Sequence, residues 1–124
     1  MPLGWRLGAC SISGLLPNWT AADVAGPEPA YRFIVANKIK DIIGDPGRVG
    51  TLAISGVRRI DSLKGASWVT CIKTQKFPLL PRYHAVFFQG GLIVDSRFSV
   101  LIDRCELQTF TPFDWEADAK NPPP

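Results

Sequence analysis

The sequence is poor in the side chains that bind metals. Its 124 residues include a single histidine, His84, and only three cysteines, Cys10, Cys71 and Cys105. Their spacing matches none of the paired zinc-ligand patterns, so we expect no metal and no other cofactor. No apolar run approaches the roughly 18 residues of a transmembrane helix. The basic residues occur in small groups without a sustained run, which argues against a nucleic-acid partner.

Motifs of enzymes are also missing. The sequence has no recognisable nucleophile motif, no glycine-rich phosphate loop and no carboxylate pair. The residues offer one catalytic arrangement, a Cys71–His84 pair assisted by Asp95 or Asp103. However, His84 lies among alternating apolar residues, which is typical of a strand histidine satisfied by the backbone, and we expect both aspartates to be solvated. The sequence therefore predicts a protein that is not an enzyme, with a small Cys71/His84 enzyme as an alternative.

The composition is that of one small globular domain. Apolar residues make up 46% of the chain, and the net charge is only +3. Pro27 and Pro29 mark a boundary after a stretch rich in small and polar residues. We expect residues 1–29 to be a disordered leader and tether, residues 30–113 to form a single domain, and residues 114–124 to be a disordered tail.

Residues 30–47 are predicted to contain a helix with one buried face. Apolar residues recur there at helical spacing, while most charged residues fall between them. Gly44 supplies a C-terminal stop, and Pro46 prevents the helix from continuing. The predicted buried face consists of Tyr31, Ile34, Val35, Ile39 and Ile42.

From residue 51 onward the apolar pattern changes to a period of two, which is typical of strands. Strand-forming residues flank Gly90 and Gly91, which suit the positive φ angles of a two-residue hairpin turn. The stretch 76–82 contains two prolines and is expected to be a loop or an edge segment. Residues 98–106 fit either a strand or a helical turn. The predicted buried face of the sheet consists of Leu52, Ile54, Trp68, Ile72, Val86, Phe88 and Ile93.

These elements predict an α+β fold. One N-terminal helix packs on a small antiparallel sheet of three or four strands, with flexible ends. A domain of this size buries a modest share of its surface and gains from a covalent crosslink.

Cys71 and Cys105 are candidates for that crosslink. Two buried free thiols in a cytosolic core are one interpretation, and a disulfide in an exported protein is the other. A disulfide closing a loop of this length would contribute roughly 3–4 kcal/mol to stability. It would also bring the end of the domain back beside the strand of Trp68, where Phe110 and Phe113 would cover the sheet.

Cys10 follows Leu7-Gly8-Ala9, an order that bacterial lipoprotein signal peptidase recognises. A tether rich in Ser, Gly and Pro comes next, and a compact region with two further cysteines follows it. The residues before Leu7 lack the apolar stretch of 7–15 residues that a signal peptide needs. Either the true start lies upstream, which we prefer, or the match is accidental. We expect lipidation at Cys10 in the first case.

The order of motifs in residues 30–113 resembles that of small lipoproteins of unknown function from rhizobia and related alphaproteobacteria. The most specific shared parts are Trp68-Val69-Thr70-Cys71 and a second cysteine, Cys105, followed by Phe110-Thr111-Pro112-Phe113. The resemblance implies a fold and a location but no activity, cofactor or catalytic residue.

The sequence thus predicts a non-enzymatic lipoprotein on the periplasmic face of the outer membrane. Its membrane contact would be the lipid anchor at Cys10, and its domain would be stapled by Cys71 and Cys105 and bind a protein partner or serve a structural role. The alternative is a small cytoplasmic interaction domain with free thiols.

Overall fold

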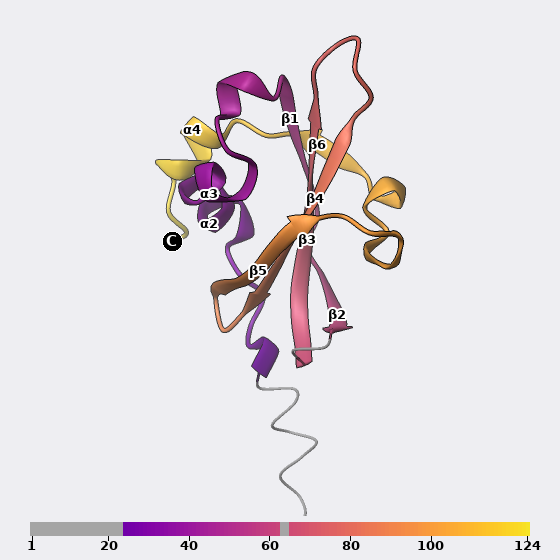
Figure 1. Ribbon diagram of the computed structural model, residues 1–124. Helices are drawn as coiled ribbons and strands as arrows, with labels where there is room; N and C mark the ends of the chain where they lie inside the picture. Colours follow the sequence, from indigo (N-terminus) through magenta and orange to yellow (C-terminus); the bar gives the residue numbers. More distant parts are fainter. Residues whose placement is uncertain (1–23, 63–64) are drawn as a thin grey trace, which may run out of the picture.

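A long central strand organises the protein. The computed structural model describes residues 24–62 and 65–124, and within them six strands form one antiparallel sheet (Figure 1). The strands are β1 (Thr51–Ser55), β2 (Arg58–Ser62), β3 (Gly65–Gln75), β4 (Arg82–Gln89), β5 (Leu92–Phe98) and β6 (Phe110–Pro112). β3 pairs with β4 along one edge and with both β1 and β2 along the other. β5 and β6 complete the two sides of the sheet.

The α+β class is confirmed, but the sheet is larger than the predicted three or four strands. The additional strands β2 and β6 are short, and β2 begins with two arginines, so neither carries a clear apolar alternation. β1 and β2 are separated by a break after Ser55. There, the backbone N–H of Cys71 donates to Ser55 Oγ at 2.8 Å, and Thr70 Oγ1 donates to the Ser55 carbonyl at 2.8 Å. Hydrogen bonds that involve side chains thus replace the backbone hydrogen bonds between the strands at the point where the chain leaves the β1–β3 pairing.

The helical elements are also more numerous than predicted. Within the described residues, the chain forms α2 (Tyr31–Asn37), α3 (Ile39–Ile43) and α4 (Trp115–Ala119), with single 3₁₀ turns η1 (Pro46–Arg48), η2 (Leu101–Asp103) and η3 (Cys105–Leu107). The predicted single helix is therefore wrong in detail. Lys38, at φ −117° and ψ 14°, leaves the helical region and divides α2 from α3.

One face of the sheet, which we call the inner face, is covered by the helices (Figure 1). Its core combines residues of α2, α3 and the strands with Phe113. All predicted members of both buried faces lie in this core, although several are only partly buried. The fully buried ones are Val35, Ile39, Ile54, Ile72, Val86 and Phe88.

The opposite face, the outer face, carries a second, smaller core that the sequence did not predict. Cys71 and Ala85 pair with each other and lie on this face, together with Val69, Phe87 and Cys105. Phe110 packs at its margin, with its ring centroid 5.8 Å from that of Tyr83. Instead of helices, the segment that contains η2 and η3 covers this core.

Both ends of the described chain are packed, which corrects two predictions. Residues 24–29, assigned to the tether, contact the sheet: the indole of Trp68 donates to the Gly26 carbonyl at 3.1 Å, and Gly90 N–H donates to the Ala25 carbonyl at 3.1 Å. Residues 114–124 were expected to be a disordered tail. Instead they contain α4, because the Asp114 side chain caps its first turn.

α4 packs against α2, far from it in sequence. An ion pair between Arg32 and Asp118 at 3.2 Å links the two helices, and Trp115 joins the inner core. The β4–β5 hairpin was predicted correctly, with Gly90 and Gly91 both at positive φ. The loop expected around Pro78 and Pro81 is also confirmed.

Candidate functional site

The segment Val100–Leu107 crosses the outer face and is bonded to it at two points. The first is Cys105, whose sulfur lies 2.12 Å from that of Cys71, with the two Cα atoms 5.6 Å apart. The pair expected from the sequence is therefore at disulfide-bonding distance. Both cysteines are completely buried, so the bond attaches the segment to the middle of β3.

The second point of attachment is Asp103, whose side chain is almost fully buried. Its two carboxylate oxygens accept hydrogen bonds from the guanidinium of Arg97 at 2.8 and 2.9 Å, and Oδ2 also accepts the backbone N–H of Val100 at 2.9 Å. The expectation that Asp103 is solvated is wrong. Its position two residues before Cys105 places it over β5, where Arg97 points from the outer face.

A second arginine reaches the same turn. The guanidinium of Arg58 donates to the backbone carbonyl of Asp103. Burial lowers the pKa of Arg58, the nearby Asp103 carboxylate raises it, and Arg104 lowers it further. Arg58 projects toward the outer face because it pairs with Val69, a member of the outer core. Arg58 on β2 and Arg97 on β5, two strands far apart in the sequence, therefore both donate hydrogen bonds to Asp103 in η2.

Held in this way, the segment turns apolar side chains toward solvent. Leu101 is 86% exposed and Ile102 is 80% exposed, and Val100 and Leu107 are exposed as well. A covalent bond and a partly buried ion pair keep these apolar residues at the surface, which makes the segment a candidate for an interaction surface. We call these four residues the outer apolar patch.

A hollow of about 540 Å³ adjoins the outer apolar patch. Val100 and Leu101 form one wall, and Tyr83 and Phe98 contribute aromatic rings. Arg82 and Glu106 supply charges of opposite sign at its margin. This mixture of apolar wall and polar rim is typical of a surface that receives part of another molecule.

The predicted Cys71–His84 catalytic pair is not formed. His84 pairs with Ile72 and shares its inner face, whereas Cys71 lies on the outer face and its sulfur is bonded to Cys105. Asp95 pairs with Phe87 on the outer face and so lies across the sheet from His84. The structure does not bring these side chains together.

His84 also differs from its expected environment. It is only 7% exposed, its ring lies 4.5 Å from that of Phe98, and in the described part of the chain its Nδ1 has no hydrogen-bond partner. The prediction that the backbone satisfies this histidine is therefore wrong. Burial lowers the pKa of His84, and the nearby Arg82 lowers it further, so both effects favour the neutral ring.

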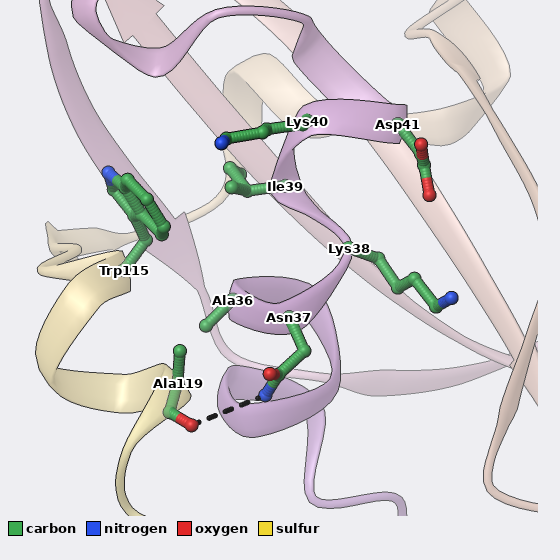
Figure 2. A pocket seen from close by; sticks show the side chains of 8 residues that line it. All are labelled: Ala36, Asn37, Lys38, Ile39, Lys40, Asp41, Trp115 and Ala119. Carbon is green, nitrogen blue, oxygen red and sulfur yellow. Dashed lines mark hydrogen bonds between the residues drawn. The ribbon is translucent and has the colours of Figure 1, made fainter.

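Another groove, of about 380 Å³, lies between α2, α3 and α4 (Figure 2). Trp115 forms one wall, and Asn37 closes the far end by donating to the Ala119 carbonyl at 3.5 Å. Lys38 and Asp41 line its margin but point away from Trp115 (Figure 2). The charged groups do not converge, so the groove is best explained as the seam where α4 is packed.

Two further findings concern the described residues only. Within residues 24–62 and 65–124, no cluster of three or more His, Cys, Asp or Glu side chains is placed to hold a metal ion. No helix among those residues is both long and apolar enough to cross a membrane. Cys10, the predicted lipidation site, lies outside the described residues.

Comparisons of the chain with protein-family models, with curated proteins and with solved structures each gave no match.

Sequence reasoning missed the residues that build the outer apolar patch. Leu101 and Ile102 fall in the stretch predicted as a strand or a helical turn, and η2 confirms the turn, but nothing in that prediction concerned their exposure or the contacts of Arg58 and Arg97 with Asp103. A usable indication was present. Two neighbouring large aliphatic residues break the period-two pattern directly before an aspartate and a cysteine, which is unusual for a buried strand.

Proposed function

We propose that this protein is a non-enzymatic interaction domain of the bacterial cell envelope, anchored by lipid at Cys10. The observation that carries the proposal is the buried pairing of Cys71 with Cys105 beneath an exposed apolar segment. Disulfides persist in oxidising compartments and are rare in the cytosol. A domain whose binding surface depends on such a bond is suited to the periplasm.

The partner is proposed to be a protein that binds the outer apolar patch. Leu101 and Ile102 offer apolar area, and the neighbouring hollow adds aromatic rings with Arg82 and Glu106 at the rim. An apolar centre with a polar margin is the usual composition of a protein interface. The clamp by Asp103 and Cys105 lowers the entropy that binding would otherwise cost.

The proposed anchoring is supported by Leu7-Gly8-Ala9-Cys10, which lies outside the described residues. A single acyl chain binds membranes only marginally, so the several chains of a mature bacterial lipoprotein would be needed. Ser11 after the cysteine, in place of Asp, favours the outer membrane as the destination. The periplasmic face of that membrane is the location we propose.

The first experiment tests export and lipidation together. The native gene, with its upstream DNA, is expressed in a bacterial host that is labelled with a fatty acid, beside its Cys10→Ala variant. We expect label in the first protein and none in the second. Alkylation of periplasmic material before and after reduction should show Cys71 and Cys105 protected until they are reduced. Unlabelled protein with free thiols would favour the cytoplasmic alternative and contradict the proposal.

The second experiment tests the interaction surface. A photocrosslinking amino acid at Ile102 should give an adduct of defined mass in intact cells, and Leu101→Glu should abolish that adduct without lowering the melting temperature. The same crosslinker at Lys40 serves as the control, because Lys40 is exposed on α3, which covers the inner face of the sheet. An adduct that persists in Leu101→Glu, or that forms equally from Lys40, would place the interface elsewhere.

A further inference from the structure

A second apolar surface lies at the tip of the β3–β4 hairpin. The loop between these strands, residues 76–81, projects beyond the rest of the sheet (Figure 1). Phe77 is 85% exposed, Leu79 61% and Leu80 86%. Three large apolar side chains at the end of a narrow hairpin contribute little to the fold, so their position calls for an external contact. We call Phe77, Leu79 and Leu80 the apolar tip.

The backbone of the apolar tip has few free N–H donors, which lowers the cost of removing it from water. Pro78 and Pro81 have no N–H group, and the N–H of Leu79 donates to the Lys76 carbonyl at 2.8 Å. A backbone donor without a partner is costly in an apolar medium, so a loop with few free donors enters such a medium at lower cost. Most surface loops lack this property because each residue brings its own N–H.

Cationic side chains surround the base of the tip. Lys76 and Arg82 are exposed at the two ends of the loop, and Arg48 lies beside it on η1. These three residues share a hollow of about 260 Å³ with Leu79 and Leu80. Asp45 lies 3.5 Å from Arg48, but both side chains are largely exposed and the attraction between them is screened. The rim is therefore positively charged.

We propose that the apolar tip inserts into the surface of an anionic lipid bilayer. The side chains of Phe77, Leu79 and Leu80 would enter the boundary between headgroups and acyl chains, while Lys76, Arg82 and Arg48 contact lipid phosphates. A bilayer suits this surface because the loop projects beyond the rest of the sheet and combines exposed apolar side chains with cationic side chains at its base, which matches the apolar interior and the anionic headgroups of the bilayer. The outer apolar patch, which adjoins a hollow, remains the surface for a protein.

The inference extends the proposed function and rests on it only for the identity of the membrane. A lipid anchor restrains one end of the chain, and a second contact at the tip would fix how the domain is turned toward the bilayer. Binding to vesicles can be measured on the full, unacylated chain with the Cys71–Cys105 bond formed. Failure of export would overturn the proposed function and leave vesicle binding intact.

The test measures partition onto vesicles by flotation. Vesicles of phosphatidylcholine alone are compared with vesicles in which part of that lipid is replaced by phosphatidylglycerol. We expect binding to the anionic vesicles to be stronger by roughly tenfold or more, and added salt to weaken it. Leu80→Ser should lower binding to the anionic vesicles by about tenfold. Lys76→Glu should lower it and reduce its dependence on salt.

Matched controls separate the tip from the rest of the surface. Leu92 is 70% exposed and lies at the β4–β5 turn, at the other end of β4, so Leu92→Ser should leave binding unchanged. Lys40→Glu on α3 is the control for charge. All four substitutions are at exposed positions, so the melting temperatures should stay close to that of the wild type.

Several results would overturn the proposal. One is failure of the wild-type chain to float with either kind of vesicle. Another is a loss of binding in Leu92→Ser as large as that in Leu80→Ser. Dimers in solution that Leu80→Ser dissociates would assign the tip to a second copy of the chain. Binding that survives Leu80→Ser but disappears in salt would reduce the contact to charge alone and remove the role of the apolar tip.

Discussion

Arg97 holds Asp103 in a two-pronged contact, with both terminal guanidinium nitrogens bonded to the two carboxylate oxygens at 2.8 and 2.9 Å. Arg97 also lies over the ring of Phe87, 5.0 Å from its centroid. The strand β5, the Arg97–Asp103 ion pair and the turn η2 thus form one unit on the outer face. The Cys71–Cys105 disulfide lies immediately beside this unit. The outer apolar patch depends on this unit for its position.

Asp103→Ala should therefore destabilise the domain. It leaves the Val100 N–H and the Arg97 guanidinium without their acceptor, and we expect a loss of about 2–4 kcal/mol in the free energy of unfolding. Arg97→Ala should cost less because its side chain is 39% exposed. In urea titrations the double variant should lose clearly less than the sum of the two single losses. Additive losses would show that the contact contributes nothing to stability.

The two cysteines give a second test. Cys71→Ser and Cys105→Ser should each lower stability by roughly 3–4 kcal/mol, since each opens the same loop of 34 residues. The double variant should cost little more than either single one. Thermal melts of oxidised protein, with reduced wild type as the control, provide the measurement. Single losses that add up would mean that the sulfurs are not bonded to each other.

His84 should make stability depend on pH. Because burial depresses its pKa below the ordinary 6.5, the unfolded chain takes up a proton more readily than the folded one. Stability should therefore fall as the pH drops below about 6.5 and stop falling from this cause below the depressed pKa. The stability of His84→Leu should lack this part of the pH dependence and keep the part that arises from the carboxylates. Parallel stability curves for wild type and variant between neutral and mildly acidic pH would contradict the assignment.

Gly50 should tolerate no side chain. It has φ +86°, and a Cβ there would lie 2.1 Å from the carbonyl oxygen of Gln75 at the base of the β3–β4 hairpin. Gly50→Ala should cost at least about 2 kcal/mol. Gly44, at φ +84° with open space around it, is the control, since Gly44→Ala carries the backbone strain without the contact. Equal losses in denaturant unfolding for the two variants would show that Gln75 plays no part.

The inner layer was predictable because its residues obey a simple period. Ile54, Ile72 and Val86 alternate with residues of the other face, and Val35 and Ile39 repeat at helical spacing. A sheet covered by an amphipathic helix needs little more than that pattern. The two-residue hairpin turn at Gly90 was predictable for a local reason as well, because glycine readily adopts the positive φ angle that such a turn requires.

The outer layer was not predictable, since it depends on contacts distant in sequence. Arg58 and Asp103 are 45 residues apart, and nothing near either one indicates the other. The helix after Asp114 has a local cap, but its packing partner α2 lies far away in the sequence, and no local pattern marks the break at Lys38. The helical turn allowed for Leu101 and Ile102 is present as η2, but their exposure was not predictable, because local pattern cannot show that a crosslink holds large aliphatic residues at the surface.

The packing of α4 on α2 has a consequence for the order in which the chain folds. Arg32 and Asp118 are joined across 86 residues, so α2 has no partner from α4 until synthesis has passed residue 119. The apolar face of α2 packs on the sheet, but the side of α2 that α4 covers stays open until the residues of α4 have been synthesised. Because this contact spans 86 residues, the inner layer is closed by one of the most non-local contacts in the fold, and contacts of this kind form late and slow the completion of folding.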